Sequence, residues 1–206
     1  TYAIGFEADS AGALFNELPY AKQVADLYRT QHKEIVVRPE VVSLLPKLLW
    51  HMDEPIADSA FITTFLVSEF ARKDVTVILS GVGGDELFGG YDGVLTAFDA
   101  HEAAGLAAGE GHGLSSARFH LEATSWIGPA AQEEALRPEL ADASGFLIGA
   151  MEREFEAQRL AAGPRATRLE AHLRLQRIGN LTALLERLDA APMRHGVEGR
   201  TPFADL

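Results

Sequence analysis

The sequence has 206 residues, with 18 Lys and Arg against 30 Asp and Glu, and a formal net charge of −12 at pH 7. This length suits one domain with a substantial core, and the negative charge argues against a general nucleic-acid binder, which needs clustered Lys and Arg. The sequence contains no Cys, which excludes disulfides, thiolate nucleophiles and Cys-ligated zinc. No apolar run approaches the ~20 residues of a membrane span and no signal peptide opens the chain, so no membrane partner and a cytoplasmic location are expected.

The first 91 residues are expected to form an α/β region. Short β-branched runs predict strands at 1–6, 34–37 and 75–79, and apolar residues at helical spacing predict helices at 17–31, 40–52 and from Asp58 or Ser59 to about Lys73. Strands that alternate with helices predict a parallel sheet with helices on both faces. Ligands bind at the carboxyl ends of the strands in such sheets, and both Gly5 and Ser80 lie at that edge.

Residues 92–206 are expected to be mostly helical. Ala and Leu dominate this half, and helices are predicted at 94–104, 115–125, 130–136, 144–160 and 166–188. A Gly/Ala-rich stretch at 105–113 predicts a break. The two halves are expected to pack as one body with a cleft between them, and the Ser80–Asp85 turn is expected to open into that cleft.

The stretch from Ser80 to Tyr91, Ser-Gly-Val-Gly-Gly-Asp-Glu-Leu-Phe-Gly-Gly-Tyr, follows the predicted strand at 75–79. Its glycines bring bare backbone N–H groups to the strand end, where a phosphate could lie close, and Asp85 and Glu86 place two carboxylates in a position suited to Mg²⁺. A tight turn with positive φ is the alternative. The preceding strand and the Gly89-Gly90 pair favour a binding site. The pattern matches neither the dinucleotide fingerprint nor the P-loop.

Two further segments accompany this motif in order along the chain. Asp53-Glu54-Pro55-Ile56-Ala57-Asp58-Ser59 lies upstream, and Glu198-Gly199-Arg200-Thr201-Pro202-Phe203-Ala204-Asp205 lies near the end. With these three segments the chain resembles the synthetase domain of the glutamine-hydrolysing asparagine synthetase family over nearly its whole length. The resemblance implies an adenine nucleotide alpha-hydrolase-like α/β part at 1–91, which binds the nucleotide, followed by a helical part at 92–206.

The resemblance also implies a reaction. A ligase of this family uses ATP and Mg²⁺ to convert the side-chain carboxylate of aspartate into β-aspartyl-AMP, with release of pyrophosphate. Ammonia that is derived from glutamine then displaces AMP and forms asparagine. Aspartate, ATP and glutamine-derived ammonia are therefore the expected partners, in amino-acid biosynthesis.

The resemblance assigns roles to individual positions of this sequence. Asp85 is implied as the Mg²⁺ ligand and, with Glu86, as catalytic. The implied nucleotide-binding residues are Ile4, Gly5, Ser80, Gly81, Gly83 and Gly84, and the implied substrate-binding residues are Asp58, Ser59 and Tyr91.

Several of these residues also have ordinary structural interpretations. Asp58 is as suited to an N-cap as to substrate contact, and Glu86 could simply favour the positive end of a helix. The Glu198–Arg200 pair favours a structural salt bridge over direct catalysis. Val82 is a departure from the family pattern, because many members carry Glu there as a base and β-lactam-forming relatives carry Tyr. Valine accepts no proton, which puts the proton-transfer step in doubt.

Two family features are missing from the sequence: the glutaminase domain and the Ser-Gly-Gly-x-Asp-Ser loop that holds pyrophosphate. The chain is therefore expected to be a fragment that is inactive by itself. Two alternatives stay open for its function: an enzyme that forms an intramolecular amide, like β-lactam synthetases or peptide-macrocycle cyclases, and a non-catalytic nucleotide-binding domain. The oligomeric state also stays open, with a homodimer as one alternative.

Overall fold

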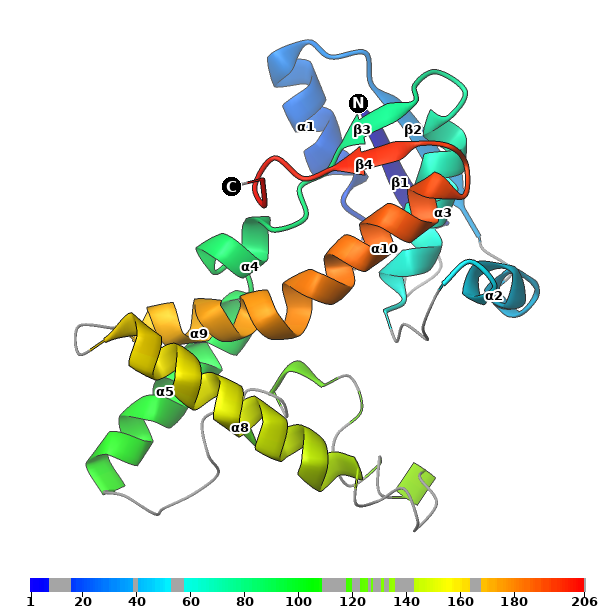
Figure 1. Cartoon of the computed structure of the whole chain (residues 1–206). Helices are drawn as coiled ribbons and strands as arrows, with labels where there is room; N and C mark the ends of the chain where they lie inside the picture. The colour runs from blue at the N-terminus through cyan, green and yellow to red at the C-terminus, as the bar shows by residue number, and fades with distance from the viewer. Residues whose placement is uncertain are drawn as a thin grey trace. The chain divides into compact units, whose positions relative to one another are not determined.

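The computed structural model describes residues 1–7, 16–38, 41–52, 58–108, 118–119, 123–125, 127, 131, 134–135, 143–163 and 168–205 (Figure 1). The chain divides into two compact units. One contains Thr1–Val82 and Ala183–Asp205, and the other contains Gly83–Thr182. The boundary between Val82 and Gly83 lies inside the glycine-rich motif, so each side of the motif is described within its own unit.

The first unit is α/β, as predicted. Its elements in chain order are β1 (Tyr2–Phe6), α1 (Leu18–Tyr28), β2 (Lys33–Val37), α2 (Val41–Leu49), α3 (Ala60–Ala71), β3 (Val77–Leu79), all but the first residue of α10 (Thr182–Met193), and β4 (Glu198–Arg200). Six of these elements were predicted from periodicity, with ends that differ by a few residues. The predicted start of α2 at Glu40 and the segment 53–57 lie outside the described residues.

The strands are parallel, but they do not form one described sheet. β1 pairs with β2 in the register Tyr2↔Lys33 to Phe6↔Val37, and β3 pairs with β4 in the register Val77↔Glu198 to Leu79↔Arg200. Within the described residues the result is two two-stranded sheets, where the sequence predicted a single sheet. The reason is that no described strand hydrogen-bonds to both β1 and β3.

β4 was not predicted, because its sequence Glu-Gly-Arg has no strand propensity. In the β3–β4 pair, the backbone of β4 at Gly199 lies close to Leu188 of α10. A Cβ atom added at Gly199 would lie 2.9 Å from both the Cγ atom and the carbonyl oxygen of Leu188, so only glycine fits there. The predicted Glu198–Arg200 ion pair is confirmed, with Arg200 Nε donating to Glu198 Oε1 at 2.9 Å.

The core of the first unit joins α2, α3 and α10. Leu48, Phe61, Phe65 and Ala191 are each at most 5% exposed and form one cluster. The hydroxyl groups of Thr63, Thr64 and Ser68 on α3 donate hydrogen bonds to backbone carbonyl oxygens of the same helix. This lets α3 present apolar surface on several sides.

Asp74, just before β3, anchors the amino ends of β1 and β2. Its carboxylate accepts hydrogen bonds from Tyr2 Oη at 3.1 Å and from Lys33 Nζ at 2.7 Å. The Lys33 hydrogen bond lowers the pKa of Asp74, and the same bond raises the pKa of Lys33. β1, β2 and β3 therefore begin at a common ion pair.

His195, in the turn after α10, is a source of pH-dependent stability. Its ring lies 4.3 Å from the ring of Phe65, centroid to centroid. Burial lowers the pKa of His195, an effect that the nearby Glu69 opposes and that Arg194, Lys47 and His51 reinforce. The unfolded chain therefore binds a proton at this position before the folded chain does as the pH falls.

We expect the free energy of unfolding to fall as the pH drops below about 6.5, the ordinary pKa of histidine. Above that pH His195 is neutral in both the folded and the unfolded chain, so it causes no loss of stability. The measurement is urea denaturation across this range for the wild type and for His195→Gln, which cannot titrate. An unchanged pH dependence in the variant would contradict this assignment.

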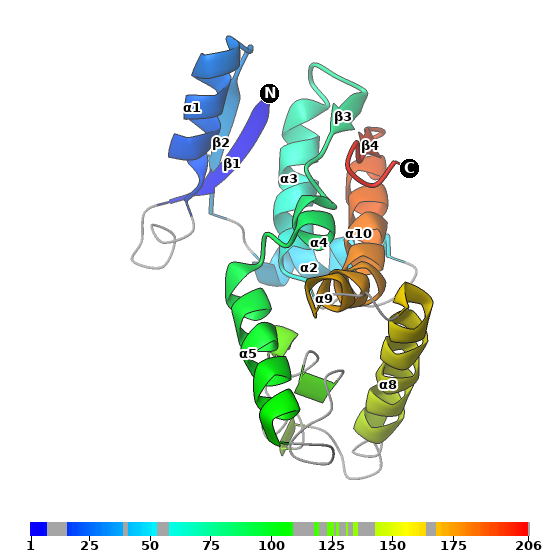
Figure 2. The same ribbon diagram turned by 90° about the vertical axis from the view of Figure 1, so that its left-hand side faces the viewer.

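The second unit is helical where it is described. It contains α4 (Gly84–Phe88), α5 (Asp92–Ala108), α8 (Ala143–Ala162), α9 (Arg168–Gln176) and a π-helical turn, η3 (Arg177–Leu181). α9 contacts both α5 and α8 (Figure 2). Among its buried residues are the apolar Phe98 and Leu175 and the polar Glu86 and Gln176.

The predicted helices of residues 92–206 are confirmed only in part. Those at 94–104 and 144–160 correspond to α5 and α8. The single helix predicted at 166–188 becomes α9, η3 and α10 and continues to Met193. Only scattered residues of the helices predicted at 115–125 and 130–136 are described. The break predicted at 105–113 does not begin at 105, because α5 continues to Ala108, and its remaining residues lie outside the described ranges. Among the helices that the structure describes, none is long and apolar enough to cross a membrane.

Candidate functional site

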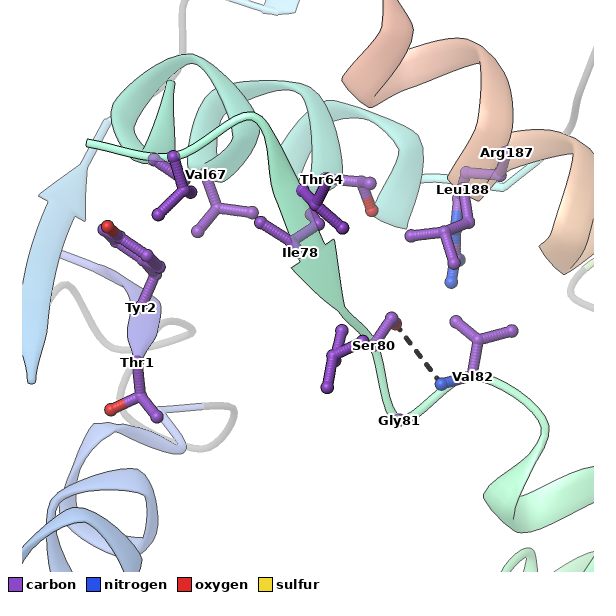
Figure 3. Close-up of a pocket in the computed structure, with 14 residues that line it drawn as sticks. Thr1, Tyr2, Thr64, Val67, Ile78, Ser80, Gly81, Val82, Arg187 and Leu188 are labelled. Carbon is purple, nitrogen blue, oxygen red and sulfur yellow. Dashed lines mark hydrogen bonds between the residues drawn. The ribbon is translucent and has the colours of Figure 1, made fainter. Parts of the chain in front are cut away.

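The carboxyl end of β3 leads into a short turn formed by Ser80, Gly81 and Val82. The Ser80 N–H donates to the carbonyl oxygen of Arg200 at 2.8 Å, and the Val82 N–H donates to Ser80 Oγ at 3.3 Å (Figure 3). A Cβ atom added at Gly81 would meet no atom within 4 Å. Packing within the described protein therefore does not explain the glycine, whereas a ligand that approaches the backbone would.

This turn forms one end of a cavity of about 510 Å³ within the first unit. Side chains from α3 and α10 surround it together with the start of β1 (Figure 3). The lining residues are Thr1, Tyr2, Thr64, Val67, Ala71, Val75, Val77, Ile78, Leu79, Ser80, Gly81, Val82, Arg187 and Leu188. The volume lies within the usual range for small-molecule sites, and the lining combines apolar side chains with few polar groups.

Arg187 supplies a positive charge to the wall of the cavity. Its Nη1 atom donates to Asp58 Oδ2, and the two side chains are 12% and 26% exposed. The other carboxylate oxygen of Asp58 accepts the backbone N–H of Ala60 at 2.9 Å. Asp58 thus ties the start of α3 to α10 and holds the guanidinium group in place.

In the second unit, the motif continues into α4 with Glu86 at its centre. Gly83 has φ = 96°, in the left-handed region where glycine is favoured. Glu86 is 2% exposed, and its Oε2 atom accepts the Gly83 N–H at 3.1 Å while Oε1 accepts the hydroxyl of Tyr91. Both oxygens therefore bind groups of the motif, an arrangement that favours a positioning role for Glu86.

Asp85, on the exposed side of α4, is packed against the second glycine pair. Gly89 caps the helix with φ = 79°, and the Gly89 and Gly90 N–H groups donate to the carbonyl oxygen of Asp85 at 2.8 and 3.1 Å. A Cβ atom at Gly90 would collide with the Asp85 carboxylate. Gly90 thereby allows the carboxylate its observed position.

We expect Gly90→Ala to displace the Asp85 carboxylate and to lower the free energy of unfolding by up to about 1 kcal/mol, because both residues are exposed and the displaced group is the end of a flexible side chain. The measurement is urea denaturation of the 206-residue chain. Gly81→Ala is the matched control, because the added methyl group meets only open space. Equal losses of stability in the two variants would contradict the proposed packing of Gly90 on Asp85.

The structure brings together only some of the residues that the sequence pointed to. Ser80 and Gly81 line the cavity, and Asp58 contacts its Arg187 wall. Ile4 does not line the cavity, and neither does Gly5, at which a Cβ atom would lie 2.5 Å from Leu18 Cδ1. Their predicted contact with adenine and ribose stays a prediction.

The remaining predicted residues lie around the start of α3 and in the second unit. Ser59 is exposed, and its side chain makes no capping bond to α3. Gly83, Gly84, Asp85, Glu86 and Tyr91 belong to the second unit. Their predicted roles in nucleotide, metal and substrate binding stay predictions.

A metal site is not assembled from the described side chains. Across the described ranges, no group of three or more His, Cys, Asp or Glu residues is placed to hold a metal ion. Asp85 could supply one carboxylate ligand, and phosphate oxygens and water are the ligands that Mg²⁺ usually adds to one or two carboxylates. The residues therefore fit a metal that arrives with a nucleotide.

Sequence reasoning missed most of the cavity wall. The cavity wall includes Thr64, Val67, Arg187 and Leu188, and none of them was among the predicted site residues. Arg187 and Asp58 are 129 residues apart in the sequence. Only the tertiary structure shows that these two charges meet.

Comparison with known families and proteins gives consistent results. The family model described as asparagine synthase matches residues 1–206. The chain is 43% identical over 93 residues to "Asparagine synthetase (glutamine-hydrolyzing) 1" of Bacillus subtilis. The aligned segment makes up 45% of this chain and 14% of that protein. The chain is also 46% identical over 92 residues to "Putative asparagine synthetase (glutamine-hydrolyzing) 2" of Methanocaldococcus jannaschii. That aligned segment makes up 44% of this chain and 17% of that protein.

The matched segments therefore cover only about a sixth of these relatives' own length. No solved structure matches the chain significantly.

Proposed function

The chain belongs to the asparagine synthase family, and from this premise we propose that residues 1–206 form part of the synthetase domain of a longer, ATP-dependent enzyme that makes asparagine. Two curated relatives named as glutamine-hydrolysing asparagine synthetases support the proposal. The single observation that carries it is the strand-end turn at Ser80–Val82, which opens on the cavity with no packing reason for Gly81. The proposed arrangement is adenine nucleotide alpha-hydrolase-like.

In the proposed reaction, a side-chain carboxylate oxygen of aspartate attacks the α-phosphorus of ATP. The bond to pyrophosphate breaks, and β-aspartyl-AMP forms. Ammonia derived from glutamine then attacks the acyl carbon, AMP leaves, and the nitrogen loses a proton to give the amide of asparagine. Much of the catalysis in this scheme is positioning, because the reacting groups must be held in line.

The residues at the β3 end would position the nucleotide. Gly81 lets a phosphate or ribose group approach the backbone closely, and Arg187, which Asp58 holds in place, offers a positive charge at the same end of the cavity. Arginine is well suited to phosphate recognition. Ile4 and Gly5 are proposed to flank the adenine and ribose.

Asp85 would supply one ligand to Mg²⁺, and that ion neutralises the charge that develops on the leaving pyrophosphate. Gly89 and Gly90 keep the carboxylate at the exposed face of α4. Glu86 would act by holding Gly83 and Tyr91, and Tyr91, with Asp58 and Ser59, is proposed to contact the acceptor. Val82 offers no base, so another group accepts the proton from the attacking amine.

An isotope-transfer experiment on the longer enzyme tests this proposal. Aspartate labelled with ¹⁸O in its side-chain carboxylate is incubated with ATP and ammonia, and the products are analysed by mass spectrometry. Because the carboxylate oxygen that attacks phosphorus stays with AMP, one label should appear in AMP for each asparagine formed. Label in inorganic phosphate would indicate an acyl phosphate and contradict the proposal. An intramolecular amide product would support the β-lactam or macrocycle alternative.

A further inference from the structure

Within the described residues, the chain crosses between the two units at two places. It leaves the first unit between Val82 and Gly83 and returns to it between Thr182 and Ala183. The first crossing lies in the glycine-rich motif. The second follows directly on η3, the π-helical turn that joins α9 to α10 (Figure 1). A change in the orientation of one unit relative to the other is therefore absorbed by the backbone at these two crossings.

The π-helical turn is an unusual element to find between two α-helices. Such turns are rare, and they occur frequently at functional sites and at points where helices bend. Gly179 lies at the centre of η3 and is not among the glycines with positive φ. A Cβ atom added there would meet no atom within 4 Å. Neither packing nor φ requires glycine at this position, and alanine favours a helix more. What glycine adds is backbone freedom.

The packing around η3 leaves one polar group unsatisfied. Gln176, the last residue of α9, is completely buried. Its Oε1 atom accepts a hydrogen bond from Asn180 Nδ2, but its Nε2 atom has no hydrogen-bond partner among the residues that the structure describes. A buried donor without a partner costs free energy. The turn is therefore held less firmly than a fully bonded helix.

The other side of η3 is exposed to solvent. Arg177, Ile178 and Gly179 are all exposed, whereas the flanking Leu175 and Leu181 are buried. Backbone with few packed neighbours on one side changes conformation at low cost. The turn can thus bend while the buried residues before and after it keep their packing.

The first crossing has the same character. Gly81 has open space where a Cβ atom would lie, and Gly83 has φ = 96°. α4, which begins at Gly84, contacts η3 within the second unit. The two crossings therefore lie beside each other, and this arrangement allows both to bend about one axis.

We propose that η3 and the segment Gly81–Gly84 are the two joints of a hinge, about which the two units change their relative orientation. The glycines of the two joints take up the changes in φ and ψ. α4 and α9 move with the second unit, whereas β3 and α10 move with the first. Hinges in other proteins likewise use a few residues at the ends of elements, and small residues are common among them.

The hinge separates the proposed metal ligand from the proposed nucleotide-binding turn. Asp85 belongs to the second unit, whereas Ser80, Gly81 and Arg187 belong to the first. Bending at the joints changes the distance between Asp85 and that turn, which gives the enzyme a way to close on a nucleotide. This consequence rests on the proposed function, whereas the hinge itself is inferred from the backbone and does not depend on the reaction.

Pairs of spin labels on the 206-residue chain test the hinge. The sequence has no Cys, so two introduced cysteines are the only labelling sites. Gln23→Cys on α1 and Ala104→Cys on α5 report across the two units, and both positions are exposed. Ala104→Cys with Ala157→Cys on α8 is the reference pair within the second unit. Pulsed electron spin resonance measures the distribution of distances for each pair.

We expect the pair across the units to give a wider distribution than the reference pair. Gly179→Ala should narrow it towards the width of the reference pair. The same variant should slow amide hydrogen exchange at 177–181 by about fivefold, the factor that corresponds to the difference in helix propensity between glycine and alanine. Because the added methyl group meets only open space, this variant keeps the fold.

Gly149→Ala is the matched control. It makes the same substitution inside α8, where a Cβ atom would lie 3.5 Å from Arg153 Nη1, an ordinary contact. It should slow amide exchange in α8 and leave the distances between Gln23→Cys and Ala104→Cys as broad as before.

Three results would contradict the hinge. A distribution across the units as narrow as that of the reference pair would show that the units form one rigid body. Slower exchange at η3 in Gly179→Ala with unchanged distances would show that η3 is not a joint. Equal narrowing in Gly179→Ala and Gly149→Ala would indicate general stiffening of the second unit.

Discussion

Asp85→Asn in the longer enzyme is expected to reduce aspartate-dependent AMP formation by about a thousandfold or more, because loss of a metal ligand removes several kcal/mol of charge stabilisation at the leaving pyrophosphate. The substitution changes little in volume, and the backbone oxygen of residue 85 can still accept the N–H groups of Gly89 and Gly90. The measurement is AMP release with aspartate, ATP and ammonia. Glutamine hydrolysis should stay largely intact, since in the proposed enzyme a separate domain carries it out.

The control for this variant is Asp92→Asn, which removes the neighbouring carboxylate in the first turn of α5. Its AMP formation should be close to that of the wild type, because Asp92 has no proposed metal role. Near-normal AMP formation by Asp85→Asn would show that the metal ligand is misassigned. A parallel loss of glutamine hydrolysis would indicate a general folding defect.

Arg187→Leu is expected to lower the free energy of unfolding of the 206-residue chain by about 2–3 kcal/mol, somewhat less than for a fully buried pair. The variant leaves the Asp58 carboxylate, which is 26% exposed, with the Ala60 N–H as its remaining donor among the described residues. Because water still reaches part of the Asp58 carboxylate, the loss of stability is smaller than for a fully buried charge. Urea denaturation followed by circular dichroism measures the change.

The double variant Asp58→Asn/Arg187→Leu separates the ion pair from other losses. Asparagine can still accept the Ala60 N–H, and it leaves no uncompensated charge beside α10. The double variant should therefore be less destabilised than the sum of its two single variants. Strict additivity would show that the Arg187–Asp58 contact contributes no coupling energy.

The local elements were largely predictable from the sequence. β1, α1, β2, α2, α3 and β3 follow from periodicity, since each depends on the spacing of apolar residues over a few turns or pleats. The motif from Ser80 to Tyr91 was also recognisable, because a strand end followed by glycines and two acids needs only neighbouring residues. The family assignment came from the same local patterns, and the match over residues 1–206 confirms it.

The site needed tertiary information at several points. The Arg187–Asp58 pair joins residues that are 129 positions apart, and the sequence around either residue gives no indication of the other. The burial of Glu86 and the hydrogen bonds of its two oxygens to Gly83 and Tyr91 depend on how α4 packs. Such contacts are set by packing, which local propensity does not encode. The predicted catalytic role of Glu86 stays a prediction.

The sequence by itself determined which segments are strands and helices in the α/β part and which residues form the glycine-rich motif. The tertiary structure alone decided how the strands pair. β4 forms because Gly199 lets the backbone approach Leu188, although Glu-Gly-Arg has no strand propensity of its own. The separation of β1–β2 from β3–β4 could likewise not be predicted from the sequence, because strand pairing depends on backbone partners that are distant in sequence. Side-chain periodicity indicates only which face of a strand is buried.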